Sequence, residues 1–184
     1  EACEDPQLKL ALNLSFAASL RMGEILGLTW DCVDISQEAI DEGRAYVLIN
    51  KELQRISKTA MKDLDMKDIL LVFPEESRRC TTVRVLKTPK TDSSLRKVFL
   101  PRSVAAMLIE QKAAQEEIKA MIGNEYKDYN LVMATSFGMP EGDGALRKKL
   151  KKLIRDHNLP DVVFHSMRHT SVTYKLKLNG GDIK

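Results

Sequence analysis

The chain has 184 residues, of which 43% are hydrophobic and 30% are charged, and its formal net charge is +3. This length and composition are typical of one globular domain with a buried core, and no apolar run is long enough to cross a bilayer. Because the N-terminus is acidic and unlike a signal peptide, we expect a cytoplasmic protein without a membrane partner. The spacing of Cys3, Cys32 and Cys80 fits neither a disulfide framework nor a zinc motif.

Charged residues are unevenly distributed along the chain. Residues 147–155 read RKKLKKLIR, and a second basic group contains Lys87, Lys90, Arg96, Lys97 and Arg102. Acidic residues concentrate elsewhere, at 1–5, 31–42 and 63–68. This separation predicts one electropositive face for a polyanion. For residues 147–155 taken alone, an ordinary solvated helix face explains the charge equally well.

The N-terminal part of the chain is mostly apolar. Asp5 followed by Pro6 predicts a helix start, and the apolar stretch after it predicts a long buried helix or a helix pair. Residues 45–50 are rich in β-formers and predict a first strand. Residues 58–76 form a charged connection with an apolar patch at 69–73.

The C-terminal part alternates strand and helix signals. Alternation over 82–87, a turn at 91–94 and a return at 96–100 predict a β-hairpin. A short strand is expected at 131–134, and helices are expected after the capping side chains of Ser103, Asp143 and Ser166. The predicted fold class is α+β, mainly helical, with a small antiparallel sheet.

Arg21 lies inside the apolar N-terminal stretch, where a guanidinium group is costly to bury unless it is paired. Glu24 follows one helical turn later and is a suitable partner. These residues alone favour a structural Arg–Glu pair over an arginine directed at an anion.

His165, Arg168 and His169 lie at the expected start of the last helix. The spacing of three between His165 and Arg168 directs both side chains to one point. Because the helix dipole favours anions at this end, basic groups there are explained by a bound phosphate or by a merely exposed first turn. A zinc ion on His165 and His169 would lack a third ligand, so no metal is expected.

Lys90 is expected at the turn of the predicted hairpin. A lysine in this place is usually solvated and protects an edge strand. Its functional alternative is a mobile proton donor that reaches into a cleft, and its position alone does not decide between the two.

The segments LRMGEILGLTW at 20–30, KTDSSLRKV at 90–98 and FHSMRHT at 164–170 resemble three sequence boxes of tyrosine site-specific recombinases, the integrases of phages and transposons. The resemblance implies the catalytic-domain fold of that family. It implies DNA integration by cleavage and rejoining of double-stranded DNA through a 3′-phosphotyrosine, without a cofactor. It also implies a tetramer of the full protein on paired DNA sites.

The resemblance assigns roles to individual side chains. Arg21 and Arg168 would hold the non-bridging oxygens of the scissile phosphate. Lys90, with Lys87 as its rival, would protonate the departing 5′ oxygen, and His165 would assist proton transfer or hold the phosphate. Glu24 and His169 would support these groups, and DNA contacts are expected from Lys87, Arg96, Arg147, Lys148 and Lys151.

The nucleophilic tyrosine of the family follows the helix that carries the third box. We therefore expect residues 1–184 to be a single catalytic domain that is incomplete at its C-terminus, lacks the family's preceding DNA-clamping domain and is inactive alone. Tyr174 lies about 240° around the helix from Arg168 and is expected to pack. The alternative function is a non-catalytic DNA-binding module with the same fold.

Overall fold

The computed structural model describes residues 3–63, 66–74, 80–89 and 94–178. Its helices are α1 (Pro6–Ala17), α2 (Met22–Leu26), η1 (Trp30–Cys32), α3 (Gln37–Asp41), α4 (Lys58–Asp63), α5 (Arg102–Ile122), η3 (Gly123–Glu125), α6 (Asp143–Asp156) and α7 (Phe164–Leu178). Its strands are β1 (Val33–Asp34), β2 (Tyr46–Ile49), β3 (Glu52–Ser57), β4 (Ile69–Val72), β5 (Thr82–Lys87) and β6 (Arg96–Phe99). The chain is thus α+β and mainly helical, with small antiparallel sheets, as predicted.

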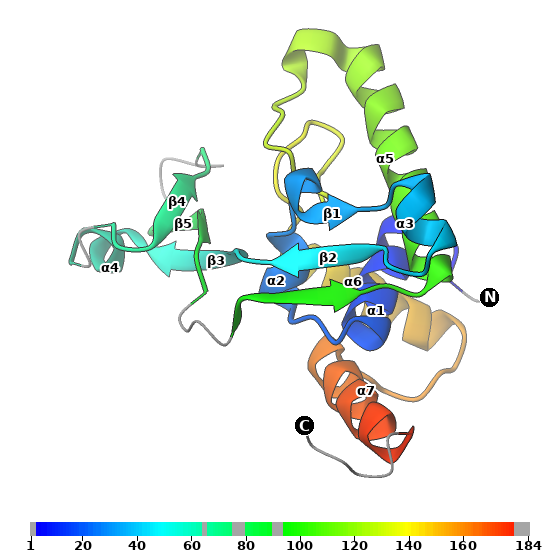
Figure 1. Cartoon of the computed structure of the whole chain (residues 1–184). Coiled ribbons are helices and arrows are strands. Elements are labelled where there is room, and N and C mark those ends of the chain that lie inside the picture. Colours follow the sequence, from blue (N-terminus) through cyan, green and yellow to red (C-terminus); the bar gives the residue numbers. More distant parts are fainter. Residues whose placement is uncertain (1–2, 64–65, 75–79, 90–93, 179–184) are drawn as a thin grey trace.

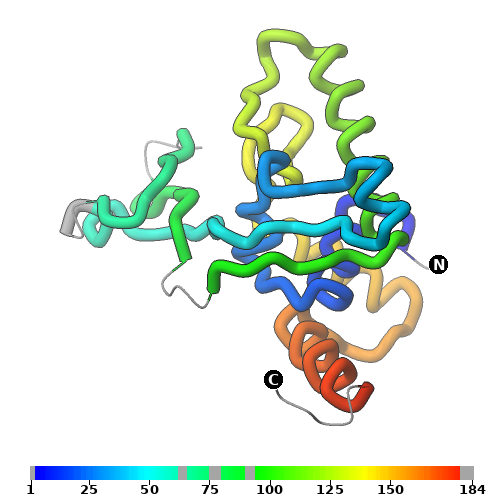
Figure 2. The backbone as a smooth tube through the Cα atoms, viewed as in Figure 1, coloured from blue at the N-terminus to red at the C-terminus, as the bar shows by residue number. Residues whose placement is uncertain are grey.

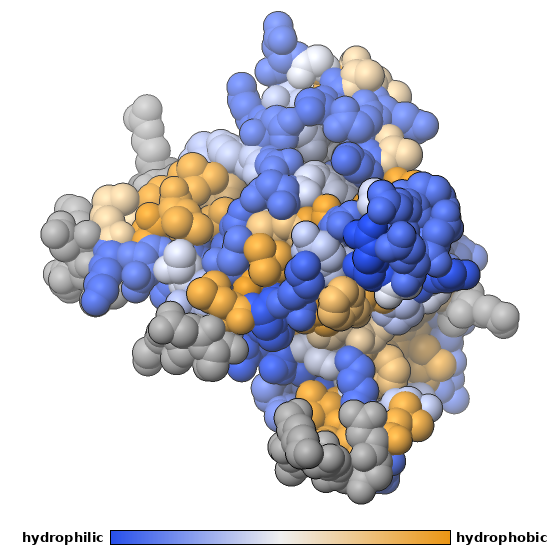
Figure 3. Space-filling view, viewed as in Figure 1, coloured by the Kyte–Doolittle hydropathy of each residue, from blue (hydrophilic) through white to orange (hydrophobic). Residues whose placement is uncertain are grey.

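The strands of the described residues form two antiparallel sheets that lie apart. One sheet has the order β1-β2-β6 and lies beside the helices, while the other has the order β3-β5-β4. The second sheet and α4 project away from the helical body as an arm, the name used below for β3, α4, β4 and β5 (Figure 1). Hydrophobic side chains gather on this arm, where Leu70 of β4 is 54% exposed (Figure 3).

The predicted hairpin between 82–87 and 96–100 is wrong in its pairing. Both segments are strands, but β5 pairs with β3 and β4, whereas β6 pairs with β2. β5 is the central strand of its sheet. Its longer partner, the edge strand β3, reads ELQRIS and was not predicted, because polar residues make its alternation weak. A partner distant in sequence therefore replaced the local one.

The apolar N-terminal stretch is a helix pair. The Asp5 carboxylate accepts a hydrogen bond from the Leu8 amide at 2.8 Å, which confirms the predicted start of α1. The chain turns at Ser19, whose φ of 54° lies in the left-handed region. Arg21 consequently lies at the N-cap of α2 and not inside a helix, as its apolar neighbours had suggested.

The end of α2 comes very close to the arm. A Cβ atom added to Gly27 would lie 2.5 Å from the backbone nitrogen of Leu53 in β3. Only glycine leaves room for this approach, which joins the arm to α2, the helix that has Arg21 at its N-cap.

Three predicted helix caps are wrong by one or a few residues. Pro101 precedes α5, Gly142 precedes α6, and α7 begins at Phe164. The predicted capping residues therefore lie within the first turns, and they are Ser103, Asp143 and Ser166. Helix ends are the least defined feature of a sequence pattern, because a polar side chain is favourable at several first-turn positions.

The core forms around α1, in which Leu8, Leu10 and Leu14 are at most 2% exposed. Although α1 and α7 lie at opposite ends of the sequence, they pack against each other (Figures 1 and 2). Residues 131–134 were expected to be a strand but form only two isolated bridges, Leu131 with Thr29 and Ala134 with Pro140. No helix within the described ranges is long and apolar enough to span a membrane.

Candidate active site

The turn before α2, helix α6 and the start of α7 enclose a cleft of about 730 Å³. Basic side chains from all three segments line it, namely Arg21, Arg147, Lys148, Lys151, His165 and Arg168. The cleft therefore brings together three predicted catalytic residues and three predicted DNA contacts. These residues come from positions more than a hundred apart in the sequence, and together they make a strongly electropositive concave surface.

A buried carboxylate lies at one edge of this cleft. Glu24 is 3% exposed and accepts hydrogen bonds from the Arg21 amide at 2.8 Å and from Arg21 Nη1 at 3.0 Å. Both of its oxygens also accept from Arg96, at 2.9 and 2.8 Å. Arg168 Nη1 lies 3.9 Å from the same carboxylate. The predicted Arg21–Glu24 pair exists, within a larger cluster of one carboxylate and three guanidinium groups.

Glu24 remains ionised in this cluster. Burial alone would raise the pKa of its carboxyl group, but the hydrogen bonds from Arg96 and Arg21 outweigh burial and lower it. For Arg168, burial and the positive charge of Arg21 lower the pKa of the guanidinium group. An arginine nevertheless stays charged at any physiological pH, so the cluster has a positive net charge.

Arg168 is held against the turn between α1 and α2. Its Nη1 donates a hydrogen bond to the Ser19 carbonyl. One and two turns further along α7, Ser171 donates to the Phe16 carbonyl and Lys175 donates to the Ala17 carbonyl at 2.7 Å. These contacts satisfy carbonyls at the end of α1 that lack helical partners. They could not be predicted, because a hydroxyl or ammonium group that bonds a distant carbonyl leaves no periodic pattern in the sequence.

His165 and His169 contact each other on the exposed side of α7. Their Nε2 atoms are 2.8 Å apart, and their rings are nearly perpendicular, with centroids 4.4 Å apart. The tautomers of the two rings determine which Nε2 is the donor. No group of three or more histidine, cysteine, aspartate or glutamate side chains that could hold a metal occurs within the described ranges.

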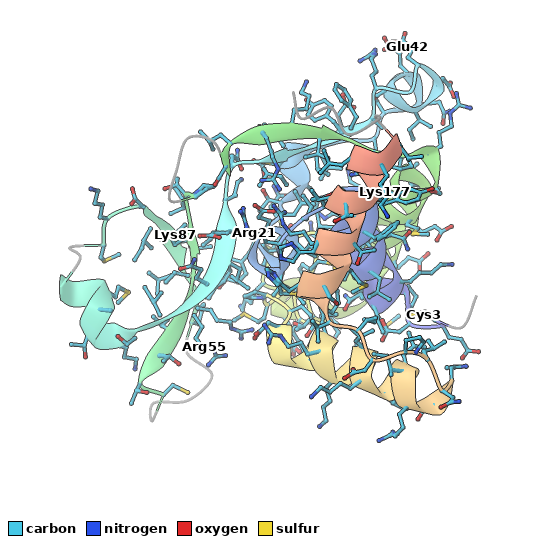
Figure 4. The ribbon with its side chains drawn as sticks, turned by 90° about the horizontal axis from the view of Figure 1, so that it is seen from below. Cys3, Arg21, Glu42, Arg55, Lys87 and Lys177 are labelled. Atoms are coloured by element: carbon cyan, nitrogen blue, oxygen red, sulfur yellow. The ribbon has the colours of Figure 1, made fainter. Side chains whose placement is uncertain are left out.

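Two further predicted site residues, Lys87 and Arg96, are described but are not among the residues that line the cleft. Lys90 lies outside the described residues. Lys87 ends β5 on the arm, opposite Glu52 of β3. Figure 4 shows Arg21 between α7 and the strands that carry Arg55 and Lys87. Arg96 directs both Nη atoms at Glu24, so its guanidinium group is engaged inside the protein, and its predicted DNA contact stays a prediction.

Tyr174 packs on the outside of α7, as expected. Its ring lies 6.5 Å from that of Phe16, centroid to centroid. Tyr174 is not among the residues that line the cleft, which contains Arg21 and Arg168.

Comparison with known proteins identifies relatives over nearly the whole chain. No family model matches. The chain is 28% identical over 176 residues to a protein named tyrosine recombinase XerC-like from Caldanaerobacter subterraneus, which covers 94% of this chain and 39% of that protein. It is 22% identical over 187 residues to the ICEBs1 integrase of Bacillus subtilis, covering 96% of this chain and 42% of the integrase. The chain is a relative of the tyrosine recombinases.

Solved structures of a transposon integrase have the same fold as this recombinase relative. The Tn1549 transposon integrase in complex with circular intermediate DNA superposes with a TM-score of 0.63 at 18% identity, over 94% of this chain and 47% of the integrase. The same integrase in complex with transposon right-end DNA gives 0.63 at 16% identity. The chain spans about two fifths of the length of the curated recombinases that it matches.

Proposed function

We propose that this chain is the phosphate-binding part of a tyrosine recombinase catalytic domain that acts in the integration of a mobile element. The observation that carries the proposal is the convergence of Arg21, His165 and Arg168 on one basic cleft. The names of the relatives, a tyrosine recombinase and an integrase, support the same function.

The chemistry proposed for the cleft is the transfer of a DNA phosphate to a tyrosine. A tyrosine hydroxyl gives its proton to His165 as its oxygen forms a bond to phosphorus. The bond from phosphorus to the 5′ oxygen breaks, and the departing oxygen takes a proton from Lys90, so that one proton in total passes from the tyrosine to the 5′ oxygen. The guanidinium groups of Arg21 and Arg168 neutralise the non-bridging oxygens as charge builds up in the transition state, for which planar, permanently charged donors are well suited. His165 would assist proton transfer from beside Arg168.

The DNA duplex would lie across the same face as the basic residues of α6. Arg147, Lys148 and Lys151 line the cleft and would contact phosphates next to the scissile one. Such contacts fix the position of the duplex but do not read its sequence. The full recombinase would act in the cytoplasm as a tetramer on paired DNA sites.

A nicked suicide duplex tests the proposal directly. The full-length protein would be incubated with duplexes that carry the ends of the mobile element encoding it, and the products would be separated on a denaturing gel. We expect a covalent protein–DNA adduct that the Arg168→Ala variant forms far more slowly. Salt-sensitive binding to the same DNA without any adduct would overturn the proposal and favour a non-catalytic DNA-binding module.

A further inference from the structure

We propose that Arg96 is a positioning residue that neutralises Glu24 and so leaves Arg21 and Arg168 available to a phosphate. The inference rests on the proposed function, because it explains how the phosphate-binding arginines are kept free. It gives Arg96 a role different from the DNA contact expected from the sequence.

The geometry separates Arg96 from the other two arginines. Arg96 donates one hydrogen bond to each carboxylate oxygen of Glu24, from Nη1 at 2.9 Å and from Nη2 at 2.8 Å. The Arg96 side chain is 28% exposed. Arg21 makes a single side-chain contact with Glu24, and its own side chain is 54% exposed. Arg168 stays at 3.9 Å. A two-point fork is the strongest form of this pair, so Arg96 is the main partner of the carboxylate.

Glu24 needs such a partner because it is buried. A carboxylate that is removed from water attracts any nearby cation, and the attraction is strong where solvent is excluded. Without Arg96, the described cations that remain at this carboxylate would be Arg21 and Arg168. Both would be drawn onto Glu24 and away from an anion in the cleft.

The position of Arg96 is fixed by the sheet of the helical body. Its backbone pairs with Ile49 at the start of β6, and its Nη1 also donates to the Ser94 carbonyl at 3.2 Å. The guanidinium group of Arg96 therefore reaches Glu24 from a strand, whereas Arg21 lies in the turn before α2. A neutralising charge on the rigid sheet leaves the turn residue free to bind a ligand.

Four variants of the full-length protein test the inference, namely Arg96→Met, Arg96→Lys, Glu24→Gln and the double variant Glu24→Gln/Arg96→Met. Single-turnover cleavage of the suicide duplex would be measured at saturating DNA, together with DNA affinity at several salt concentrations. Arg44→Met is the matched control. Like Arg96, Arg44 forms ion pairs with glutamate, but its partners Glu38 and Glu42 lie away from the cleft. Melting temperatures would establish that each variant is folded.

The expected result is a cleavage defect that depends on the charge of Glu24. Arg96→Met should slow cleavage roughly tenfold or more, and Arg96→Lys, which keeps the charge, should be less affected. The double variant should cleave faster than Arg96→Met, since the neutral amide in place of the Glu24 carboxylate no longer attracts Arg21 and Arg168. The salt dependence of DNA affinity should be that of the unaltered protein.

Two results would overturn the inference while leaving the proposed function intact. One is a double variant that cleaves no faster than Arg96→Met. The other is normal cleavage by Arg96→Met at saturating DNA with a shallower salt dependence, which would make Arg96 a phosphate contact. Absence of cleavage by the unaltered protein would instead overturn the proposed function, and this inference with it.

Discussion

The guanidinium group of Arg168 donates a hydrogen bond to the backbone carbonyl of Ser19, a residue 149 positions earlier in the chain. Ser19 lies two residues before Arg21, and both arginines line the same cleft. The distance between the two phosphate-binding candidates is therefore set by the packing of α7 on the end of α1.

Removal of Arg168 should affect the reaction more than DNA binding. Arg168→Ala in the full-length protein should slow adduct formation by about 10²–10³-fold, as is usual for the loss of one transition-state donor. Binding of the duplex should weaken only modestly, because many other basic groups remain. Gel-based cleavage assays and a binding titration at one salt concentration check both parts. An equal loss in both would point to a simple binding role.

Ser171 should contribute to stability through its contact with the end of α1. It is 1% exposed, and Ser171→Ala would leave the Phe16 carbonyl without this donor. We expect the free energy of unfolding to fall by about 1–3 kcal/mol, the usual cost of an unsatisfied buried group. Urea unfolding measures this loss. Thr173→Ala, at an exposed position of the same helix, is the control and should change stability much less.

Asp31 should make stability depend on pH in the acid range. Burial alone would raise the pKa of its carboxyl group, but hydrogen bonds from Thr29 and Lys51 outweigh burial and lower the pKa from 3.8 to about 2. A lowered folded-state pKa stabilises the protein above the unfolded value, and the effect is lost as the pH falls through the folded value. The stability difference between the native protein and Asp31→Asn should therefore be constant above about pH 5 and shrink below about pH 3.8. A difference that does not change with pH would contradict this.

Lys148 and Lys151 should contribute to DNA binding through phosphate contacts. Replacement of both by alanine should weaken binding to any duplex sequence and reduce the salt slope by about 0.9 for each phosphate that is no longer neutralised. Fluorescence anisotropy at several salt concentrations measures the slope. Lys149→Ala is the matched control, because this lysine of the same helix pairs with Asp5 at 2.8 Å and does not line the cleft. Equal slopes for the control and the double variant would contradict a role specific to the cleft.

Much of the candidate site could be predicted from the sequence, because its residues lie in short segments that resemble known boxes. Arg21, His165 and Arg168 do line one cleft. The cleft geometry could not be predicted, since it depends on the left-handed turn at Ser19 and on contacts from α7 that carry no periodic signal. The pairing of Arg96 with Glu24 was also missed, because a charged residue in a strand is interpreted as solvated or DNA-binding until its partner is known.

The sequence predicted the fold correctly where the signal lies within a few residues, and the prediction failed where the structure depends on residues distant in the chain. The start of α1 was predicted from Asp5 and Pro6, which act within one turn. The pairing of β5 was wrong because a turn signal favours the next strand in the chain, whereas β3 offered a longer, better matched partner. Pairing over such a distance depends on the packing of the whole sheet, which a pattern of period two does not encode.

The contacts between α1 and α7 also determine when the cleft can form during synthesis. The carbonyls at the end of α1 and the Ser19 turn emerge early from the ribosome, but Arg168, Ser171 and Lys175 emerge late. Until then Arg21 lacks the arginine that α7 contributes to the cleft. The cleft therefore cannot form before α7 is synthesised, and a nascent chain that stops before α7 lacks the pair of Arg21 and Arg168 proposed to bind a phosphate.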